Sequence, residues 1–520
     1  MPSTDRRAGG LSLRDLLPSA RYFGAADIEF TSCCGSPDSC QPGDLFVALC
    51  GAEGDSHEQI AVAAERGAVG VVCERFLPTS LPQCIVGDTR VAYGILCQAI
   101  AGDPCQQMRT IGITGSNGKT VTAMLLASIL ATRVQGPYAR PIGVTSSLGY
   151  SDGQRQQPAV RTTPVQPELA HWLARMTANN CEYAVIEASS KAMADRRLAG
   201  VRFDCVLMTN LRRDHLPEHH SLANYRRLKA RLFRQLKPGG SAVLNADDSS
   251  TAAFVRRIHS PILTYGMQNL ADVCGEVLER APGEQTFLLT AGNDAVPVRT
   301  RMIGDHHVSN CLAAAATALL LGFDLPEIAR GLERVEHLPG RLENIHCGQP
   351  FQVYLDGART PDAIRAALHA VRQVTTGRVI AVGGAEGSTD NVRRAEIGTV
   401  LEQGSHAVVL TNNDPGDQPP LAIVHDLLDG FRKPEKARVA PSRANAIEWA
   451  LRLAQSGDSV VILGKGDRES ELVGNRRLPW NDRQFTRDKL YALQASPQGL
   501  PPRLQVAEEI PHSHRFRVVG

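Results

Sequence analysis

The sequence predicts an α/β protein of three domains, in which the central and the C-terminal domains are doubly wound parallel sheets. Apolar, β-branched runs alternate with helical stretches along most of the chain, which is typical of strands joined by helices. A glycine-rich turn at residues 114–118 separates one such run from a helical stretch. The length of 520 residues is that of about three ordinary domains.

The composition indicates a soluble globular protein. Hydrophobic residues make up 43% and charged residues 21% of the chain. The sequence contains no run of about 18 apolar residues, so no membrane span is predicted. A net charge of +2 gives no indication of a nucleic-acid partner. The 13 cysteines are scattered without paired C-x-x-C spacing, which indicates reduced thiols rather than disulfides or a zinc site. We expect a cytoplasmic protein without membrane insertion, acting as a monomer.

The predicted strands divide the chain into domains. An N-terminal domain, 1–105, has strands at 45–49 and 69–73 around a helical stretch at 57–66. The central domain, 106–338, closes with a helix at 308–321 and has strands at 108–113, 183–186, 205–209, 242–244 and 287–289. The C-terminal domain, 339–495, has a helix at 445–454 and strands at 351–355, 379–382, 407–411 and 459–463. The proline-rich tail, 496–520, is predicted to be loose.

The turn Thr114-Gly115-Ser116-Asn117-Gly118-Lys119-Thr120 has the features of a phosphate-binding loop. Its glycines let backbone N–H groups approach an anion, and the start of the following helix adds favourable dipole charge. Lys119 would reach the β- and γ-phosphates, and the Thr120 hydroxyl would ligate Mg²⁺. The usual P-loop has glycine where Ile113 stands, so this loop is a variant. A plain glycine-rich turn with a surface lysine is the alternative.

Further along the chain, Glu187 and two histidines are candidate metal or phosphate ligands. Glu187 ends an apolar strand, where a buried carboxylate needs a partner such as Mg²⁺; a solvated strand end is the alternative. His215 follows Asp214 and precedes His219 by four residues, so the two histidines share a face if the segment is helical. A surface or core position explains either histidine equally well.

Lys229 stands at helical spacing between two aromatic residues, Tyr225 and Phe233. Partial burial would lower the pKa of a lysine there, and a neutral amine adds CO₂ to give a carbamate, which is a bidentate anion for Mg²⁺. Periodicity alone favours the commoner case, a lysine whose stem is buried and whose ammonium reaches water.

Several polar residues fall near the predicted strand ends. Thr162, Thr163 and Ser189 offer hydroxyl groups, whereas Arg197 and Arg341 offer planar guanidinium groups suited to carboxylate or phosphate. Lys465, between two glycines, follows the last predicted strand. None of these residues is specific by itself.

Taken in order, the motifs resemble those of the Mur ligase family, and most closely its MurE branch. The resemblance runs from about residue 27 to 490 and rests on stretches that keep family-like spacing. They are 42–49, 112–120, 162–164, 187–190, 209–211, 213–215, 225–233, 243–248, 339–341, 360–363 and 464–466. The ordered set, rather than any one motif, is specific.

The resemblance implies three domains, which bind a UDP precursor, bind ATP and close the site from the C-terminal side. It also implies ATP-dependent addition of the third amino acid to UDP-N-acetylmuramoyl-L-Ala-D-Glu in peptidoglycan synthesis, by way of an acyl phosphate. The loop from Thr114 to Thr120 would hold ATP together with Asn210, Asn310 and Arg341. Thr120, Glu187, His215 and carbamylated Lys229 would ligate Mg²⁺, and the catalytic group would be Lys119, Glu187, His215 and Lys229. Thr162, Thr163, Ser189 and Arg197 would hold the muramoyl peptide.

The chain departs from the family pattern at several positions. The diaminopimelate-reading Asp-Asn-Pro-Arg is here 413–416, Asn-Asp-Pro-Gly, so its arginine is missing. The Gly-His-Glu sequence is 466–468, Gly-Asp-Arg, which reverses a charge where a carboxylate would meet a distal ammonium. His307 stands where the family has asparagine, and Lys191 where it has histidine. These changes predict an unusual acceptor site.

Two functions of different class remain open. The first is an active amide ligase with an altered acceptor, which the retained loop, Glu187, His215 and Lys229 favour. The second is a catalytically weakened paralogue that binds nucleotide or wall precursor, which the changed C-terminal residues favour. A sister ligase, such as a folylpolyglutamate or cyanophycin synthetase, is a third possibility. The segment 225–233 and the N-terminal domain speak against it.

Overall fold

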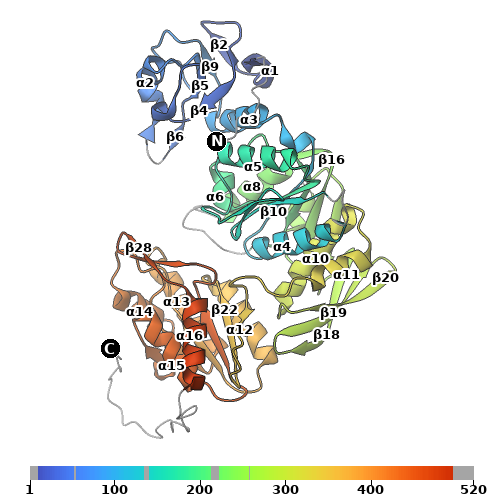
Figure 1. Cartoon of the computed structure of the whole chain (residues 1–520), viewed down its shortest axis with the longest axis vertical. Helices are drawn as coiled ribbons and strands as arrows, with labels where there is room; N and C mark the ends of the chain where they lie inside the picture. Colours follow the sequence, from blue (N-terminus) through green and yellow to red (C-terminus); the bar gives the residue numbers. More distant parts are fainter. Residues whose placement is uncertain (1–9, 52–53, 134–139, 212–221, 257, 496–520) are drawn as a thin grey trace. The chain divides into compact units, whose positions relative to one another are not determined.

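The computed structural model describes residues 10–51, 54–133, 140–211, 222–256 and 258–495 (Figure 1). The chain divides into two compact units, one up to Thr264 and one from Tyr265 onward. This division falls within the segment 106–338 that we expected to be one domain. The boundaries at residues 105, 338 and 495 remain predictions. The large parallel sheets of both units confirm the predicted α/β class.

The N-terminal part of the first unit is a five-stranded sheet of order β2-β9-β8-β5-β4. Strands β4, β5, β8 and β9 are parallel, and β2 is antiparallel. The sheet strands are β2 (Arg21–Phe23), β4 (Ser32–Cys34), β5 (Asp44–Val47), β8 (Gly70–Cys73) and β9 (Gln83–Ile85). Around them lie β1 (Leu11–Ser12), β3 (Glu29–Phe30), β6 (Cys50–Gly51), β7 (Gly54–Asp55), α1 (Leu13–Leu16), α2 (Ile60–Glu65) and α3 (Thr89–Ile100).

The central sheet of the first unit has the order β13-β12-β11-β14-β10-β15-β16-β17. Strands β11, β14, β10, β15 and β16 are parallel, in agreement with the mostly parallel sheet that we expected, although β11 was not among the predicted strands. The strands are β10 (Arg109–Thr114), β11 (Ile142–Ser146), β12 (Gly149–Ser151), β13 (Gln156–Gln157), β14 (Tyr183–Glu187), β15 (Phe203–Met208), β16 (Leu236–Asn245) and β17 (Ile262–Gly266). The helices are α4 (Lys119–Leu130), α5 (Gln166–Ala178), α6 (Ser190–Ala194), α8 (Leu222–Phe233) and α9 (Ala252–Val255).

Helices cover both faces of this sheet, with α4 on one side and α5, α6 and α8 on the other (Figure 1). Ala184 and Ile186 of β14 belong to the core formed with α5, which includes Trp172. Successive side chains of a strand point to opposite faces. Glu187 therefore lies on the other face from Ile186, the face covered by α4. All five residues of β14 are buried, so the strand end is not solvated.

The second unit begins with an antiparallel meander of β18 (Val273–Ala281), β19 (Glu284–Ala291) and β20 (Asp294–Thr300). Residues 287–289 are in a strand, β19, as we expected, and this strand pairs antiparallel with both of its neighbours. Buried and half-exposed residues alternate along β19, which is the pattern of an antiparallel strand with one covered face. Helices α10 (Asp305–Leu320) and α11 (Leu325–Glu333) follow.

The C-terminal sheet has the order β21-β22-β26-β23-β24-β25, and all neighbours are parallel except β21 and β22. Its strands are β21 (Glu343–Asn344), β22 (Gln352–Asp356), β23 (Val379–Gly383), β24 (Ala407–Leu410), β25 (Ala437–Val439) and β26 (Ser459–Leu463), and β27 (Ser470–Val473) and β28 (Arg476–Pro479) form a hairpin beside it. The helices are α12 (Pro361–Val374), α13 (Asn391–Gly404), α14 (Pro420–Leu428), α15 (Arg443–Leu453) and α16 (Asp482–Ala495). This arrangement confirms the predicted doubly wound C-terminal domain.

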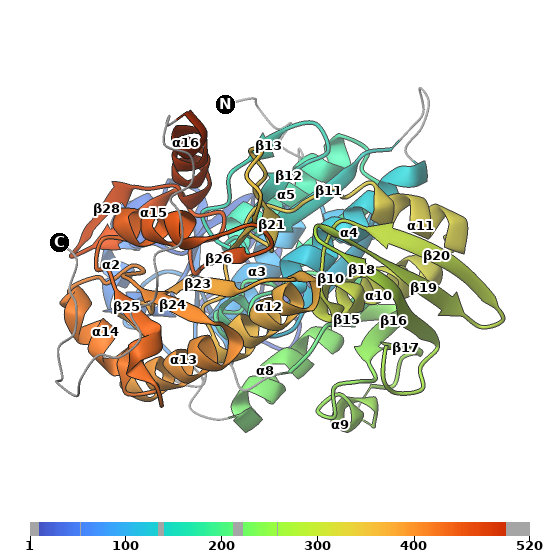
Figure 2. The same ribbon diagram turned by 90° about the horizontal axis from the view of Figure 1, so that it is seen from below.

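The helices of the C-terminal sheet form two layers, with α12 and α13 on one face and α15 and α16 on the other (Figure 2). Tyr354 of β22 packs in the core under α12 and α13, whereas its neighbours Val353 and Leu355 pack under α15 and α16. A strand buried on both faces reads as a continuous apolar run, which is why the sequence revealed these strands.

A buried ion pair joins α15 to α16 and to the end of β26. Arg443 donates from Nε and Nη2 to the two carboxylate oxygens of Asp482 at 2.8 and 2.6 Å, and both side chains are 1% exposed. Nη2 of Arg443 also donates to the Leu463 carbonyl at 2.9 Å. The indole N–H of Trp480 donates to Asp482 at 2.6 Å. Both charged groups of this buried pair are therefore hydrogen-bonded, and buried charges are stable only when they are paired and hydrogen-bonded in this way.

All 13 cysteines of the sequence lie in the described part of the chain and are free thiols. This agrees with the reduced state that their spacing predicted. Within the described ranges, no helix combines the length and the apolar character needed to cross a membrane.

We predict that Arg443→Met lowers the free energy of unfolding by about 3–5 kcal/mol, because Asp482 would remain buried without its counter-charge. Urea unfolding followed by tryptophan fluorescence measures this change, since Trp480 contacts the pair directly. Arg452→Met, which removes an exposed partner of Glu448, is the control and should cost less than about 0.5 kcal/mol. Equal losses in the free energy of unfolding for the two variants would show that the buried pair contributes no more to stability than the exposed one.

Candidate active site

The glycine-rich turn joins the end of β10 to the start of α4, as expected. Gly115 and Gly118 both have positive φ, +149° and +84°, a region that other residues rarely adopt. A Cβ atom on Gly115 would lie 1.8 Å from the Thr209 hydroxyl. The backbone at Gly115 and Gly118 thus adopts conformations that favour glycine, and the turn leads directly into the N-terminus of α4, which is the end of a helix that attracts anions.

The residues after β15 hold this turn in place. The Asn210 amide accepts from the Asn117 N–H at 3.0 Å and donates to the Asn117 carbonyl at 3.1 Å. The Asn210 carbonyl accepts from the Ser116 N–H at 2.9 Å, and the Thr209 hydroxyl donates to the Asn117 carbonyl at 2.6 Å. Asn210 was predicted to contact ATP. In this structure its side chain is bonded to the loop, whose conformation it therefore supports.

A buried carboxylate and two hydroxyl groups meet beside the start of α4. The Thr120 hydroxyl lies 3.1 and 3.0 Å from the two carboxylate oxygens of Glu187, which is 2% exposed. The Ser147 N–H donates to Glu187 at 3.0 Å, and the Ser147 hydroxyl lies 2.8 Å from that of Thr120. These are oxygen donors of the kind that Mg²⁺ prefers, so the set fits a magnesium ion.

Two lysines donate to the carbonyl groups of the loop. Lys119 Nζ donates to the Ser116 carbonyl at 2.9 Å. Lys229 Nζ donates to the Gly115 carbonyl at 2.8 Å and to the Thr114 hydroxyl at 3.3 Å. The Lys229 side chain is fully buried, so its ammonium does not reach water as the alternative required. The structure thus brings the turn, Glu187 and both lysines to one region of the first unit.

The predicted peptide-binding residues adjoin this region. The Thr163 hydroxyl donates to the Glu187 carbonyl at 2.7 Å and lies 3.4 Å from the Ser189 hydroxyl. Ser189 caps α6 by accepting from the Ala192 N–H. Arg197, 8% exposed, donates to the Thr163 carbonyl at 3.0 Å and to Asp195 at 2.7 Å. Thr162 is adjacent in the chain.

Some predicted residues cannot be placed. His215, Asp214 and His219 lie outside the described residues, and the side chain of Tyr225 is not described either. The predicted roles of His215 and His219 therefore remain predictions.

In the second unit, Asn310 is a buried residue of α10. Arg341 donates to the Gly340 carbonyl at 2.9 Å and to Asp467 at 3.2 Å. His307 is 2% exposed, its ring is 4.1 Å from that of His306, and neither ring nitrogen has a hydrogen-bond partner among the described residues. Burial holds the pKa of His307 well below its ordinary value, so the imidazole is neutral. The predicted roles of Asn310 and Arg341 in holding ATP remain predictions.

Cys50, Asp55 and His57 form a polar cluster beside the five-stranded N-terminal sheet, and their spacing in the sequence did not reveal it. The His57 ring lies 2.6 Å from Asp55 and 3.6 Å from the Cys50 thiol, both through Nδ1. His57 Nε2 accepts from the Glu74 N–H at 3.0 Å, so the ring proton is on Nδ1 and points to Asp55. A metal-bound histidine normally donates from its second nitrogen, so this cluster has the form of a hydrogen-bond network rather than a metal site.

Sequence reasoning missed Ser147 and Thr209. Ser147 lies in a turn after β11, a strand that was not predicted, and only the run of hydroxyl residues 145–147 marks it. Thr209 was seen as the end of a strand, but its contact with Asn117 depends on how β15 lies beside β10.

The family comparisons match both units. The Mur ligase middle domain matches residues 113–318, and the Mur ligase glutamate ligase domain matches residues 340–466. The UDP-N-acetylmuramoyl-L-alanyl-D-glutamate–2,6-diaminopimelate ligase of Geobacillus thermodenitrificans is 35% identical over 453 residues, which cover 86% of this chain and 92% of that relative. The enzyme of the same name from Aquifex aeolicus is 34% identical over 455 residues, 86% of this chain and 91% of its own length.

Solved structures agree with these sequence matches. A structure of UDP-N-acetylmuramoyl-L-alanyl-D-glutamate–2,6-diaminopimelate ligase has a TM-score of 0.67 and 25% identity, covering 94% of this chain and 100% of its own. The MurF ligase of Thermotoga maritima, solved with ADP, has a TM-score of 0.59 at 18% identity and covers 89% of this chain and 96% of its own. At that identity the second likeness shows the shared fold only.

We predict that Gly115→Ala weakens the affinity for Mg·ATP more than tenfold, because the new Cβ would collide with Thr209 and distort the loop. Isothermal titration with Mg·ATP measures the change. Gly87→Ala is the control, since a Cβ there meets no atom within 4 Å and its affinity should be unchanged. Unaltered affinity in Gly115→Ala would remove the loop from the nucleotide site.

Proposed function

We propose, because this chain belongs to the Mur ligase family, that it is an ATP-dependent ligase which adds an amino acid to UDP-N-acetylmuramoyl-L-Ala-D-Glu in peptidoglycan synthesis. The named relatives are ligases that join 2,6-diaminopimelate to this precursor. ATP would phosphorylate the precursor's carboxylate, and the amine of the incoming amino acid would attack the acyl phosphate. The acceptor is left open here, because the residues at 413–416 and 466–468 depart from the family pattern.

The observation that best supports an active enzyme is the Thr120–Glu187–Ser147 cluster at the start of α4. A buried carboxylate is costly to retain unless it has hydrogen bonds or a cation. Here it has both the hydroxyl and N–H partners and a position next to the anion-binding turn. A protein that bound no metal or nucleotide would have no reason to keep a buried carboxylate at this position.

The residues of the loop would act mainly by position and charge. The N–H groups of Gly118, Lys119 and Thr120 at the start of α4 would bind phosphate oxygens, and the Lys119 side chain would move from the Ser116 carbonyl to the β- and γ-phosphates. Magnesium, held by Thr120 and Glu187 with His215 as a further ligand, would neutralise charge on the transferred phosphoryl group. Thr163, Ser189 and Arg197 would orient the carboxylate of the muramoyl peptide. Phosphoryl transfer depends on this kind of alignment more than on a covalent protein group.

We further propose that Lys229 is carbamylated. Its side chain is fully buried, and its amine lies 3.3 Å from the Thr114 hydroxyl and 2.8 Å from the Gly115 carbonyl, next to the glycine-rich turn. Addition of CO₂ would replace the amine by an anion next to the loop, and so supply another oxygen ligand for Mg²⁺.

A weakened paralogue that binds precursor or nucleotide is the second candidate. The observation that favours it is the set of ion pairs around Arg468, which occupies the region where the resemblance places the acceptor's distal group. The two candidates differ in one measurable property, turnover of ATP that depends on an amino acid.

We predict that release of phosphate from ATP requires both UDP-N-acetylmuramoyl-L-Ala-D-Glu and an amino acid. The reason is that the acyl phosphate forms only on bound precursor and is consumed only by an amine. A coupled phosphate assay over a panel of amino acids measures this, with Thr120→Val as a variant that keeps the side-chain volume but lacks the hydroxyl. Absence of phosphate release with every amino acid would support the paralogue instead.

We predict that Lys229→Ala lowers kcat by at least about 100-fold, since an anionic ligand beside the loop is lost, and that added acetate partly restores it. Lys237→Ala, which removes a half-buried partner of Asp204 away from the loop, is the matched control and should keep its activity. A ¹³C resonance of carbamate in wild-type protein supplied with labelled bicarbonate, missing from Lys229→Ala, would identify the group. Full activity in Lys229→Ala would exclude it.

A further inference from the structure

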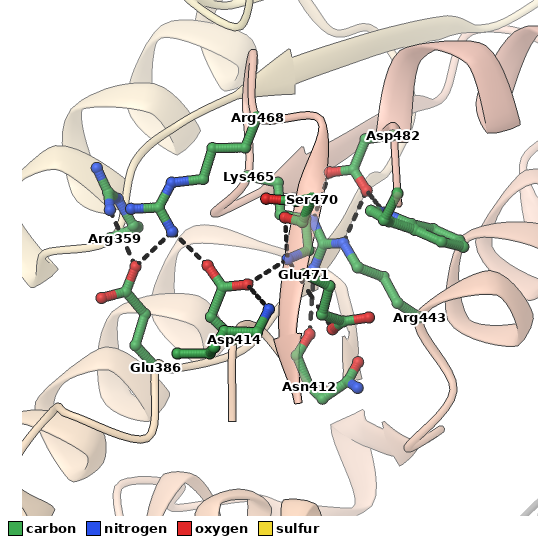
Figure 3. Close-up of polar contacts among 12 residues, drawn as sticks. Arg359, Glu386, Asn412, Asp414, Arg443, Lys465, Arg468, Ser470, Glu471 and Asp482 are labelled. Atoms are coloured by element: carbon green, nitrogen blue, oxygen red, sulfur yellow. Dashed lines mark hydrogen bonds and ion pairs between the residues drawn. The ribbon is translucent and has the colours of Figure 1, made fainter. Parts of the chain in front are cut away.

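A cluster of ion pairs lies at the carboxyl ends of the C-terminal sheet (Figure 3). Arg359 follows β22, Glu386 follows β23, Asp414 follows β24, and Lys465 and Arg468 follow β26. Parallel doubly wound sheets bind their ligands beyond this edge. The hydrogen-bonding capacity of the cluster therefore indicates which ligand groups this edge is able to accept.

Asp414 and Glu386, the two carboxylates that pair with Arg468, are already bonded to protein groups, and a third carboxylate, Glu471, lies 3.9 Å from the buried ammonium of Lys465. Asp414 accepts from Lys465 at 2.7 Å and from the Leu472 N–H at 2.9 Å through one oxygen, and from Arg468 through the other. One oxygen of Glu386 accepts from both Arg359 and Arg468 at 2.9 Å. Burial by itself would raise the pKa of both carboxyl groups, but these cationic partners hold each pKa below its ordinary value. Both groups are therefore ionised and paired.

The two outer guanidinium groups, by contrast, have unused donors. Arg359 and Arg468 each bond through Nη1 alone, and their Nε and Nη2 groups have no hydrogen-bond partner in the described part of the chain. Their side chains are 41% and 36% exposed, and both reach the same Glu386 oxygen, so the two cationic ends are neighbours. Lys465 differs, because its side chain is 0% exposed and is bonded to Asp414.

The groups of the cluster that are left to bind a ligand are thus mainly the N–H donors of two positively charged guanidinium groups. A carboxylate is bound well by guanidinium N–H groups, which match it in geometry and charge. An ammonium would approach the two exposed cations, and the carboxylates beside them, Glu386 and Asp414, are already paired. At Gly416, where the family resemblance places an arginine, there is no side chain to add a further cation.

We propose that Arg359 and Arg468 bind a distal carboxylate of the incoming amino acid, so that the acceptor is an α-amino acid with a second carboxylate and needs no distal ammonium. This inference rests on the proposed ligase function, because it assigns the acceptor of that reaction. The named relatives join 2,6-diaminopimelate, which has both distal groups. In this protein, Arg359 and Arg468 would recognise the distal carboxylate, and no group would be needed for the distal ammonium.

Four amino acids separate the two distal groups. meso-2,6-Diaminopimelate has the carboxylate and the ammonium, L-2-aminopimelate has only the carboxylate, L-lysine has only the ammonium, and L-norleucine has neither. We expect kcat/KM for 2-aminopimelate to exceed that for norleucine by about 10- to 100-fold, the usual effect of hydrogen bonds to a charged group. Lysine should be no better than norleucine, and diaminopimelate no better than 2-aminopimelate.

Variants of the two arginines test their part in this preference. Arg468→Gln and Arg359→Gln should each reduce the ratio of 2-aminopimelate to norleucine by at least about threefold, through KM rather than kcat. Arg365→Gln is the control, since Arg365 is an exposed arginine of α12 paired with Asp362, and should leave the ratio unchanged. Thermal unfolding of all three variants identifies any loss caused by instability.

The experiment distinguishes this inference from the ligase function. If lysine or diaminopimelate is turned over well and 2-aminopimelate is not, the ligase function stands and the inference is overturned. If no amino acid releases phosphate, calorimetric binding of 2-aminopimelate and norleucine to the protein with Mg·ADP and precursor decides the matter. Tighter binding of 2-aminopimelate, lost in Arg468→Gln, supports the carboxylate site without turnover. Equal binding of the two overturns it.

Discussion

The contact between the Glu187 carboxylate and the Thr120 hydroxyl is the interaction on which the geometry of the first unit depends. Strands β10 and β14 are parallel and in register, with Ile113 beside Glu187, so the carboxylate arrives where the glycine-rich turn begins. The turn then reverses the chain into α4 and places Thr120 over it. A buried carboxylate must be compensated, and the hydroxyl and the Ser147 N–H do so while leaving a set of oxygen atoms suited to a divalent cation.

The same requirement, that buried charge be paired, has a different result in the second unit. At the edge of the central sheet one carboxylate is bonded to hydroxyl and backbone groups, which leaves it available to a cation. At the edge of the C-terminal sheet the carboxylates of Asp414 and Glu386 are neutralised by lysine and arginine side chains. The two edges have the same topology, yet the first is suited to a metal and a polyphosphate, and the second to an anionic group.

The parts of the fold that were predictable are those with a strong local pattern. Strands β14, β22, β23 and β26 are buried on both faces and read as continuous apolar runs. The turn before α4 was recognisable because positive φ angles demand glycine. The antiparallel pairing of β19 was overlooked although it is local, because two-residue turns that contain Gly283 and Gly292 join β19 to β18 and β20. The role of Ser147 could not be read from its run of hydroxyl residues, because its contact with Glu187 depends on the position of β11 beside β14.

The sequence by itself determined the class of the chain: the order of the motifs, the loop, and the presence of Lys119, Thr120, Glu187 and Lys229 at their spacings. Only the tertiary structure decided what those side chains contact. Burial of Lys229 beside the Gly115 carbonyl, and the pairing of Arg468 with Asp414 across 54 residues of chain, are not visible in any local pattern. The physical reason is that periodicity and turn chemistry act over a few residues, whereas burial and charge pairing arise when distant segments are packed together.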